Sequence, residues 1–217
     1  MYELYYYPSN ANLAPHILLE ELGVAHKLVL VDRERDKHKS PEFLKLNPTG
    51  RIPVLVDGDL VLYETAAICL HLVDCHPNAG FAPLVGTPAR AEFYKWLIYL
   101  TNTLQAEIIT YYYPDRLADD HAGAEMVKRH AEMRVGPMLD LIEDTLAKNT
   151  TDKRGPYLLG ANYLAVDPYL LMLARWTRNF ANPARSRLHL GRFLESIAMR
   201  PAVRRAFEAE GLTAPFF

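Results

Sequence analysis

Four residues of the types that bind metal ions lie close together in one segment of the chain: Cys69, His71, Cys75 and His76. Metal ligands on one helix need a spacing of three or four residues, because only then do their side chains share a face. Only His71 and Cys75 have such a spacing, and the two cysteines are six residues apart. The pattern therefore predicts no metal site here, and we expect the protein to work without a metal ion.

Arginines are concentrated toward the C-terminal end of the chain. Residues 175–205 contain eight arginines and a single acid, Glu195. Such a stripe can attract an anionic substrate or partner, but it is more often the solvated face of a helix. The whole chain has a formal net charge of −2 and a pI near 6.4, which does not indicate nucleic acid as a partner.

The composition is that of an ordinary globular protein. The chain has 217 residues, of which 50% are hydrophobic and 23% charged, enough for a sizeable core in one large or two small domains. No apolar run reaches the roughly 18 residues needed to cross a bilayer, and the start MYELYYYP lacks the features of a secretory signal. Two cysteines cannot build a disulfide framework, so we expect a cytoplasmic protein without membrane partners.

The elements that must position any site differ between the two parts of the chain. The first part predicts strands at 2–7, 26–32, 53–56 and 60–62 and helices at 16–22, from 40 onward, and at 64–76. A strand, helix and strand within about 30 residues predict a right-handed parallel unit. Asp57-Gly58 between two apolar runs predicts a hairpin. Together these patterns predict a small mixed sheet flanked by helices.

The second part of the chain predicts helices alone. After a segment rich in proline and glycine, helical spacing recurs at 89–113, 124–148, 167–180, 190–199 and 202–210. We therefore predict an α/β domain at 1–78, a linker at 79–88 and an all-helical domain at 89–217.

Three segments resemble the glutathione transferase family. Residues 43–72 (FLKLNPTGRIPVLVDGDLVLYETAAICLHL) are similar to the family's loop that ends in a cis-proline and to its acidic-Ser/Thr-x-x-Ile helix start. Residues 6–23 (YYPSNANLAPHILLEELG) resemble the first strand, active loop and first helix of bacterial members with a LAPH element. Residues 160–171 (GANYLAVDPYLL) are similar to a motif of the helical domain. The resemblance implies a thioredoxin-like first domain and a C-terminal helical bundle.

The resemblance also implies glutathione as co-substrate and a set of residues that hold it. The backbone of Ile52, before a cis Pro53, would pair with the ligand like an added strand. Glu64 would take the α-amine of the γ-glutamyl group, and Thr65 its carboxylate, at a helix N-terminus whose free N–H groups favour anions.

The glycyl end of glutathione is assigned by the same resemblance. His38 and Lys39 lie where relatives often hold the glycyl carboxylate, and Arg51 is placed to assist. Residues 33–39 form a charged run, however, and such runs are commonly solvated surface.

The resemblance leaves the catalytic group open among Tyr6, Ser9 and Asn12. The family holds the thiol of glutathione as thiolate, through a Tyr or Ser hydroxyl or with a cysteine of the protein. The position of that cysteine in LAPH-bearing relatives is Ala11, and no cysteine lies among the first 68 residues. We favour Ser9 and Asn12 in the loop over Tyr6 on the strand, and Asn10 is a less favoured candidate.

These features favour a transferase that conjugates glutathione to a small hydrophobic electrophile, with a role in detoxification. The open alternatives are a glutathione-dependent disulfide reductase or peroxidase, suggested by Asn12, and a non-catalytic ligand-binding or interaction protein. A homodimer is expected from the resemblance, and Tyr112 or Trp176 is a candidate for lining the electrophile pocket. The helical-domain motif departs at Leu164, where the family usually has Ser or Thr, while Asp167 is retained.

Overall fold

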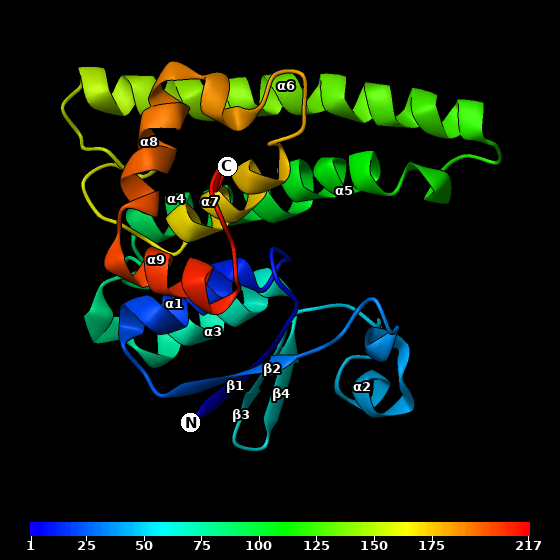
Figure 1. Ribbon diagram of the computed structural model, residues 1–217. Helices are drawn as coiled ribbons and strands as arrows, with labels where there is room; N and C mark the ends of the chain where they lie inside the picture. The colour runs from blue at the N-terminus through cyan, green and yellow to red at the C-terminus, as the bar shows by residue number, and fades with distance from the viewer. The chain divides into compact units, whose positions relative to one another are not determined.

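The structure, a computed structural model, describes all 217 residues, Met1–Phe217 (Figure 1). Contacts divide the chain into two compact units. One unit comprises Met1–Ala82 and Ala198–Phe216, and the other comprises Pro83–Ile197 together with Phe217. The first unit thus combines both ends of the chain, and the domain bounds 1–78, 79–88 and 89–217 stay a prediction. No helix combines the length and the apolar character that crossing a membrane requires.

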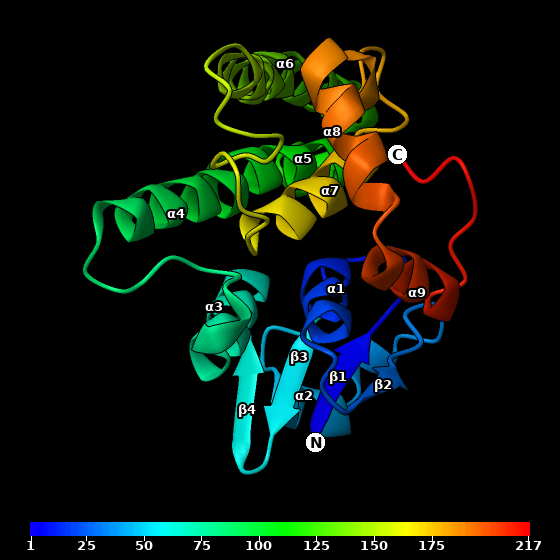
Figure 2. The ribbon, with the colours of Figure 1, turned by 90° about the vertical axis from the view of Figure 1, so that its left-hand side faces the viewer.

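The sheet of the first unit has four strands in the order β2-β1-β3-β4 (Figure 2). The strands are β1 (Tyr2–Tyr6), β2 (His26–Leu30), β3 (Val54–Asp57) and β4 (Leu60–Tyr63). Strand β1 runs parallel to β2 and antiparallel to β3, and β3 and β4 form an antiparallel hairpin. All four strands predicted from the sequence are confirmed.

Helices cover both faces of this sheet. They are α1 (Leu13–Leu22), α2 (Pro41–Leu46) and α3 (Thr65–Cys75), and α1 and α3 lie on the same face (Figure 2). Successive side chains of a strand point to opposite faces. Tyr5, which pairs with Val54, packs with Phe43 of α2, whereas the next pair, Leu4 and Leu55, is fully buried toward the other face. This is the thioredoxin-like arrangement.

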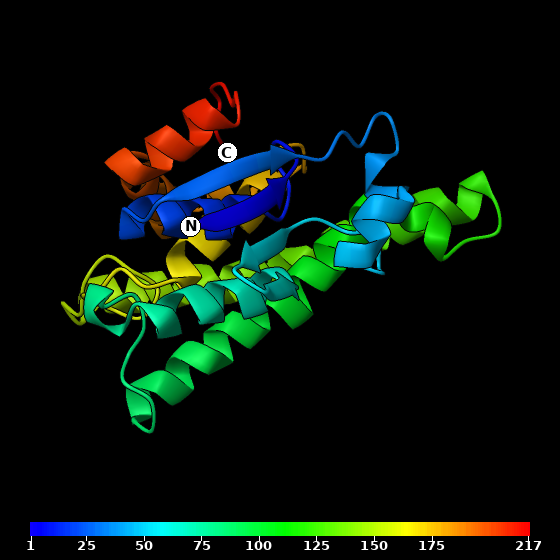
Figure 3. The same ribbon diagram turned by 90° about the horizontal axis from the view of Figure 1, so that it is seen from below.

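A fourth helix of the first unit comes from the end of the chain. Helix α9 (Pro201–Ala209) lies beside α1, red beside blue in Figure 3. Its side chains Val203, Ala206 and Phe207 are buried. Arg200 donates two hydrogen bonds to the carboxylate of Glu21, at 2.5 and 2.9 Å. The arginines of residues 175–205 therefore do not all lie on one solvated helix face, because some of them form ion pairs.

The second unit is helical. Its helices are α4 (Pro88–Ile98), α5 (Ala106–Tyr112), α6 (His121–Thr151), α7 (Val166–Trp176) and α8 (Leu188–Ala198). A π-helical segment, Tyr99–Gln105, joins α4 to α5, so the helix predicted at 89–113 is present but wider at its middle. A helical unit after a thioredoxin-like unit confirms the predicted fold class.

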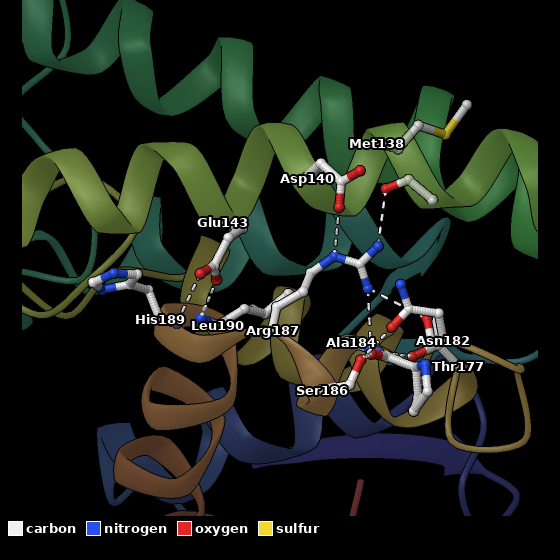
Figure 4. Close-up of polar contacts among 12 residues, drawn as sticks. Met138, Asp140, Glu143, Thr177, Asn182, Ala184, Ser186, Arg187, His189 and Leu190 are labelled. Atoms are coloured by element: carbon white, nitrogen blue, oxygen red, sulfur yellow. Dashed lines mark hydrogen bonds and ion pairs between the residues drawn. The ribbon is translucent and has the colours of Figure 1, made fainter.

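Polar side chains of α6 hold the segment that leads into α8 (Figure 4). The buried Arg187 donates from Nε to Asp140 Oδ1 at 2.8 Å and from Nη2 to the carbonyl of Gly136 at 3.1 Å. Glu143 accepts hydrogen bonds from the backbone N–H groups of His189 and Leu190, at 2.9 and 2.7 Å. A carboxylate from one helix thereby caps the N-terminus of the other.

The helical-domain motif is built around Asp167. This side chain is fully buried, and its two oxygens accept hydrogen bonds from the N–H groups of Leu158 (3.0 Å) and Leu164 (2.7 Å). Ala165, the residue before α7, makes no side-chain cap. Leu164 lacks a hydroxyl for capping but is itself buried, so the position serves the apolar core.

Candidate functional site

The loop between β1 and α1 carries two of the three candidate catalytic residues, Ser9 and Asn12. Ser9 adopts a left-handed backbone with φ of 61°, an uncommon conformation for a residue other than glycine. Its N–H donates to Glu210 Oε2 at 2.9 Å. Its side chain is half-buried. The backbone of the loop is thus held by a carboxylate from beyond the end of α9.

Glu210 organises this loop and was not anticipated from the sequence. The residue is only 4% exposed, and its side chain is fully buried. In addition to Ser9, it accepts hydrogen bonds from Asn12 Nδ2 and His16 Nδ1, both at 2.8 Å to Oε1. The partners lie about 200 positions earlier in the chain, so no local pattern could have pointed to them.

Asn12 is fully buried, and both ends of its amide are engaged. Its Oδ1 accepts from the Tyr7 N–H at 3.1 Å, and its Nδ2 donates to Glu210. A side chain in this position fixes the shape of the loop. With no exposed surface, the amide does not reach a ligand in this conformation.

Tyr6 is the last residue of β1 and points to the same face of the sheet as Leu4. Burial, and then the negative charge of Glu210, raise the pKa of the Tyr6 phenol above its usual value. The phenol is therefore protonated at neutral pH. It can donate a hydrogen bond to an anion but cannot serve as a base.

The loop before β3 presents an unpaired stretch of backbone. The Ile52-Pro53 peptide bond is cis, both residues are buried, and the N–H and C=O of Ile52 have no backbone partner. Asn47 Nδ2 donates to the carbonyl of Arg51 at 2.7 Å, which braces the loop from within. The side chain of Arg51 is exposed. A ligand with its own peptide groups could pair with Ile52.

The start of α3 lies against the loop before α1. Thr65 is buried and its hydroxyl donates to the carbonyl of Ala11 at 3.2 Å, so the N-termini of α1 and α3 are neighbours. Glu64 precedes α3 with an exposed side chain and a φ of 73°. Strained backbone of this kind in residues other than glycine is concentrated at ligand sites.

His38 lies close to the cis-proline loop. Its carbonyl oxygen is 3.2 Å from the place where a Cβ on Gly50 would stand. Burial, helped by the positive charges of Arg33 and Lys39, lowers the pKa of His38, so its ring is neutral at pH 7. Nδ1 of this ring is buried without a hydrogen-bond partner. The exposed Lys39 pairs with Asp36 at 2.9 Å.

The structure therefore joins the sequence candidates into two groups. Asn12 and Ser9 share Glu210, and their loop touches Thr65 through Ala11. His38 lies against the loop that carries Arg51, Ile52 and Pro53. In the second unit, the hydroxyl of Tyr112 donates to the backbone carbonyl of Trp176.

Two groups of metal-binding residue types also come together. One is His16, Glu20 and His26, and the other is Asp57, His71 and Cys75. His71 and Cys75 were the only pair of these residues considered from the sequence. His16 and Glu20 also lie four residues apart on one helix, α1, whereas His26 and Asp57 come from strands.

The fold and the site together define a class of protein: a thioredoxin-like domain with a cis-proline loop, joined to a helical domain. Residues 1–74 match the family model described as "Glutathione S-transferase, N-terminal domain". The chain is 31% identical to glutathione S-transferase 3 of Zea mays over 216 residues, covering 94% of this chain and 93% of that protein. It is 27% identical to glutathione S-transferase GstA of Escherichia coli O157:H7, covering 97% and 99%.

Solved structures agree with these relatives. A glutathione transferase homolog from Sulfitobacter with bound glutathione superposes with a TM-score of 0.86 at 26% identity, covering 98% of this chain and 99% of that one. A glutathione transferase from Methylococcus capsulatus gives 0.83 at 32% identity, covering 98% and 100%. The chain belongs to the glutathione S-transferase family of enzymes.

Proposed function

We propose that the first unit binds glutathione and that the enzyme transfers the glutathione thiolate to a small apolar electrophile. The observation that carries this proposal is the junction of two helix N-termini at the Thr65–Ala11 hydrogen bond, beside the strained and exposed Glu64. Helix N-termini favour negative charge, which both a carboxylate and a thiolate bring.

The γ-glutamyl end of the ligand lies at α3 in this proposal. Glu64 takes the α-amine. Because the Thr65 hydroxyl already donates to Ala11, the free N–H groups of the first turn of α3 take the carboxylate. The backbone N–H and C=O of the cysteinyl residue of glutathione pair with the C=O and N–H of Ile52, next to Pro53. The ligand thereby adds a short strand to the protein.

The glycyl carboxylate lies near His38 in this proposal. A neutral His38 contributes a hydrogen bond, not a charge, since its pKa is lowered. The positive charge then comes from Lys39 and Arg51, whose side chains are exposed. Exposed cations attract a carboxylate only modestly, so we assign most of the affinity to Ile52 and Glu64.

The thiolate is stabilised by hydrogen bonds from the loop before α1. Ser9 is our first choice of donor and the protonated Tyr6 our second, while Asn12 acts as a positioning residue through Glu210. In the reaction the thiol proton passes to solvent and the sulfur forms a bond to the electrophilic carbon. The bond to the leaving group then breaks with its electron pair.

Reduction of disulfides is the second candidate reaction. Burial raises the pKa of Cys69, and burial together with Asp57 and Asp74 raises that of Cys75. Neither thiol is therefore a thiolate at neutral pH. This favours a route in which two glutathione molecules reduce one disulfide and leave as oxidised glutathione, with no cysteine of the protein involved.

We further propose that the enzyme is a cytoplasmic homodimer, with folding domains bounded as predicted from the sequence. Both cysteines are free thiols, in keeping with a reducing compartment. Sedimentation equilibrium measures the oligomeric state directly, and a monomer at micromolar concentration would contradict this part of the proposal.

Calorimetry of glutathione binding tests the proposed function. We expect micromolar-to-millimolar binding by the wild type and a loss of about tenfold or more in Glu64→Ala, because a charge-assisted hydrogen bond contributes roughly 1.5–3 kcal/mol. Glu125→Ala, an exposed acid in the first part of α6, is the matched control and should bind as the wild type. No binding by the wild type at millimolar glutathione would overturn the proposal.

A further inference from the structure

Three side chains with metal-binding atoms converge between helix α1 and the start of β2. His16 and Glu20 are four residues apart on α1 and so share one face, and His26 is the first residue of β2. Gly23 ends α1 with a φ of 63°, the left-handed conformation that turns the chain back toward the helix. One ligand atom from each of the three lies within 4.8 Å of the others. We propose that His16, Glu20 and His26 bind a divalent transition-metal ion of the zinc type.

One ring nitrogen of His16 lacks a hydrogen-bond partner. The side chain is fully buried. Its Nδ1 lies 2.8 Å from the carboxylate of Glu210, which can only accept, so Nδ1 carries the hydrogen. Its Nε2 is buried with no hydrogen-bond partner. A buried polar atom left unpaired is costly, and a bound cation would use its lone pair.

His26 has the same arrangement. Its Nδ1 lies 2.9 Å from the carbonyl of Val24, which again can only accept, so a neutral ring leaves Nε2 with a lone pair. Metal-binding histidines characteristically donate their other N–H to a carboxylate or a backbone carbonyl, which fixes the tautomer and orients the ring. His16 and His26 each have one of these two kinds of acceptor.

Glu20 completes the set at a suitable distance. Its Oε1 is 3.5 Å from His26 Nε2. Two ligands that each lie about 2.0–2.1 Å from a tetrahedral zinc ion are about 3.3 Å apart. Arg205 Nε holds the other oxygen of Glu20 at 2.5 Å and so orients the carboxylate. Rotation about the side-chain bonds of Glu20 can adjust the position of its carboxylate to an ion held by His16 and His26.

The ligand types favour zinc over magnesium or calcium. Two imidazoles and one carboxylate suit zinc, nickel and copper, whereas magnesium and calcium prefer oxygen ligands. The side chains of His26 and Glu20 are 13% and 18% exposed, which gives the ion a path from solvent and leaves a fourth position for water. The site includes none of the residues proposed to hold glutathione, although His16 shares the carboxylate of Glu210 with Ser9 and Asn12.

The cluster of Asp57, His71 and Cys75 is the comparison for this site. There His71 Nε2 already has Asp57 as a partner at 2.9 Å, and no buried atom is left unpaired. The raised pKa of Cys75 also disfavours the thiolate that binds metals.

Zinc titration of the whole protein tests the proposal. Untagged protein, stripped with a chelator that is then removed, is titrated with zinc chloride against a coloured competing chelator. We expect one zinc ion per chain, and affinities at least about tenfold weaker in His26→Asn and in Glu20→Gln, each of which loses one of three ligands. Cys75→Ser is the matched control and should bind zinc as the wild type does.

Cobalt absorption and unfolding without metal complete the test. Cobalt bound at the proposed site gives visible bands without sulfur-to-metal charge transfer. Thermal unfolding of metal-free His26→Asn shows whether this variant is folded before its zinc affinity is measured. If His26→Asn is not folded, the zinc affinity of Glu20→Gln provides the test. The proposal fails if the wild type binds no zinc at micromolar concentration, if the Glu20 and His26 variants bind as tightly as the wild type, or if only Cys75→Ser loses the ion.

Discussion

Two buried carboxylates, one in each unit, do similar work over very different distances along the chain. Asp167 is fully buried and accepts from the N–H groups of Leu158 and Leu164, both within nine residues. Glu210 is 4% exposed and accepts from Ser9, Asn12 and His16, about 200 residues away. Both carboxylates accept hydrogen bonds from buried backbone or side-chain donors, which would otherwise have no partner.

The difference lies in what each carboxylate holds. Asp167 fixes the start of its own helix α7, which is a matter of stability within the second unit. Glu210 fixes the loop that carries the proposed thiolate donors, and it joins α9 to α1 in the first unit. We therefore expect the two carboxylates to separate in their effect on activity, although both matter for stability.

Glu210→Ala should have the largest effect. It leaves the donors of Ser9, Asn12 and His16 without their acceptor, and removing one partner from a buried charged network costs about 3–5 kcal/mol. Urea unfolding measures the loss, and conjugation activity should fall with it even where the variant is folded. Wild-type activity in a destabilised Glu210→Ala would show that Glu210, like Asp167, serves stability alone.

Asp167→Ala should come next, with a loss of about 2–4 kcal/mol from two backbone N–H groups left unpaired. Thermal or urea unfolding measures it against Asp144→Ala, an exposed acid on α6 that should change little. The affinity of the folded variant for glutathione should stay within a factor of two or so of the wild type. A large loss of affinity would mean that Asp167 also serves the site.

A double-mutant cycle sharpens the role of Asn12. Because Asn12 Nδ2 donates to Glu210, the effects of Asn12→Ala and Glu210→Ala should not add, with a coupling of roughly 0.5–3 kcal/mol. Unfolding free energies of the two single variants and the double variant give this number. Additive effects would show that Asn12 does not act through Glu210.

Ser9→Ala tests the donor that the Glu210 loop carries. Losing one hydrogen bond to the thiolate should raise the apparent pKa of bound glutathione by about one unit, equivalent to about 1.4 kcal/mol. Activity should fall about tenfold at neutral pH and recover as the pH rises. Tyr6→Phe run in parallel tells which hydroxyl is responsible, since only the true donor shifts the pH profile.

Arg205→Ala should have the smallest effect, about 0.2–1 kcal/mol of stability. Its side chain is 54% exposed, and its pair with Glu20 is therefore weakened by solvent. Unfolding at low and high salt measures the contribution, which salt should diminish. A loss above about 2 kcal/mol would show that the pairs between α1 and α9 act as a buried network.

Much of the fold could be predicted because its signals are local. Gly58 in the β3–β4 hairpin and Gly23 at the end of α1 both adopt the positive φ that their positions require. The π-helical Tyr99–Gln105 segment could not be predicted, since its side chains follow ordinary helical spacing. The sequence also does not show that α9 belongs to the first unit, because the apolar face of a helix does not indicate which element it packs against.

The candidate site could likewise be predicted only where its residues are close together in the sequence. Ile52, Pro53, Glu64 and Thr65 lie in one short stretch whose pattern resembles a known family. The burial of Asn12 follows from Glu210, and the grouping of His16, Glu20 and His26 follows from the turn at Gly23. Such arrangements depend on where separate elements meet in space.

The packing of α9 on α1 has a consequence for synthesis on the ribosome. The first 82 residues emerge early, yet their unit stays open on one side until Pro201–Ala209 has been translated. At about 5–20 residues per second that interval lasts on the order of ten seconds. Meanwhile the face of α1 that will contact α9 is uncovered, and Glu20 and Glu21 have not yet paired with Arg205 and Arg200. The first unit, whose translation begins first, is thus the unit whose packing is completed last.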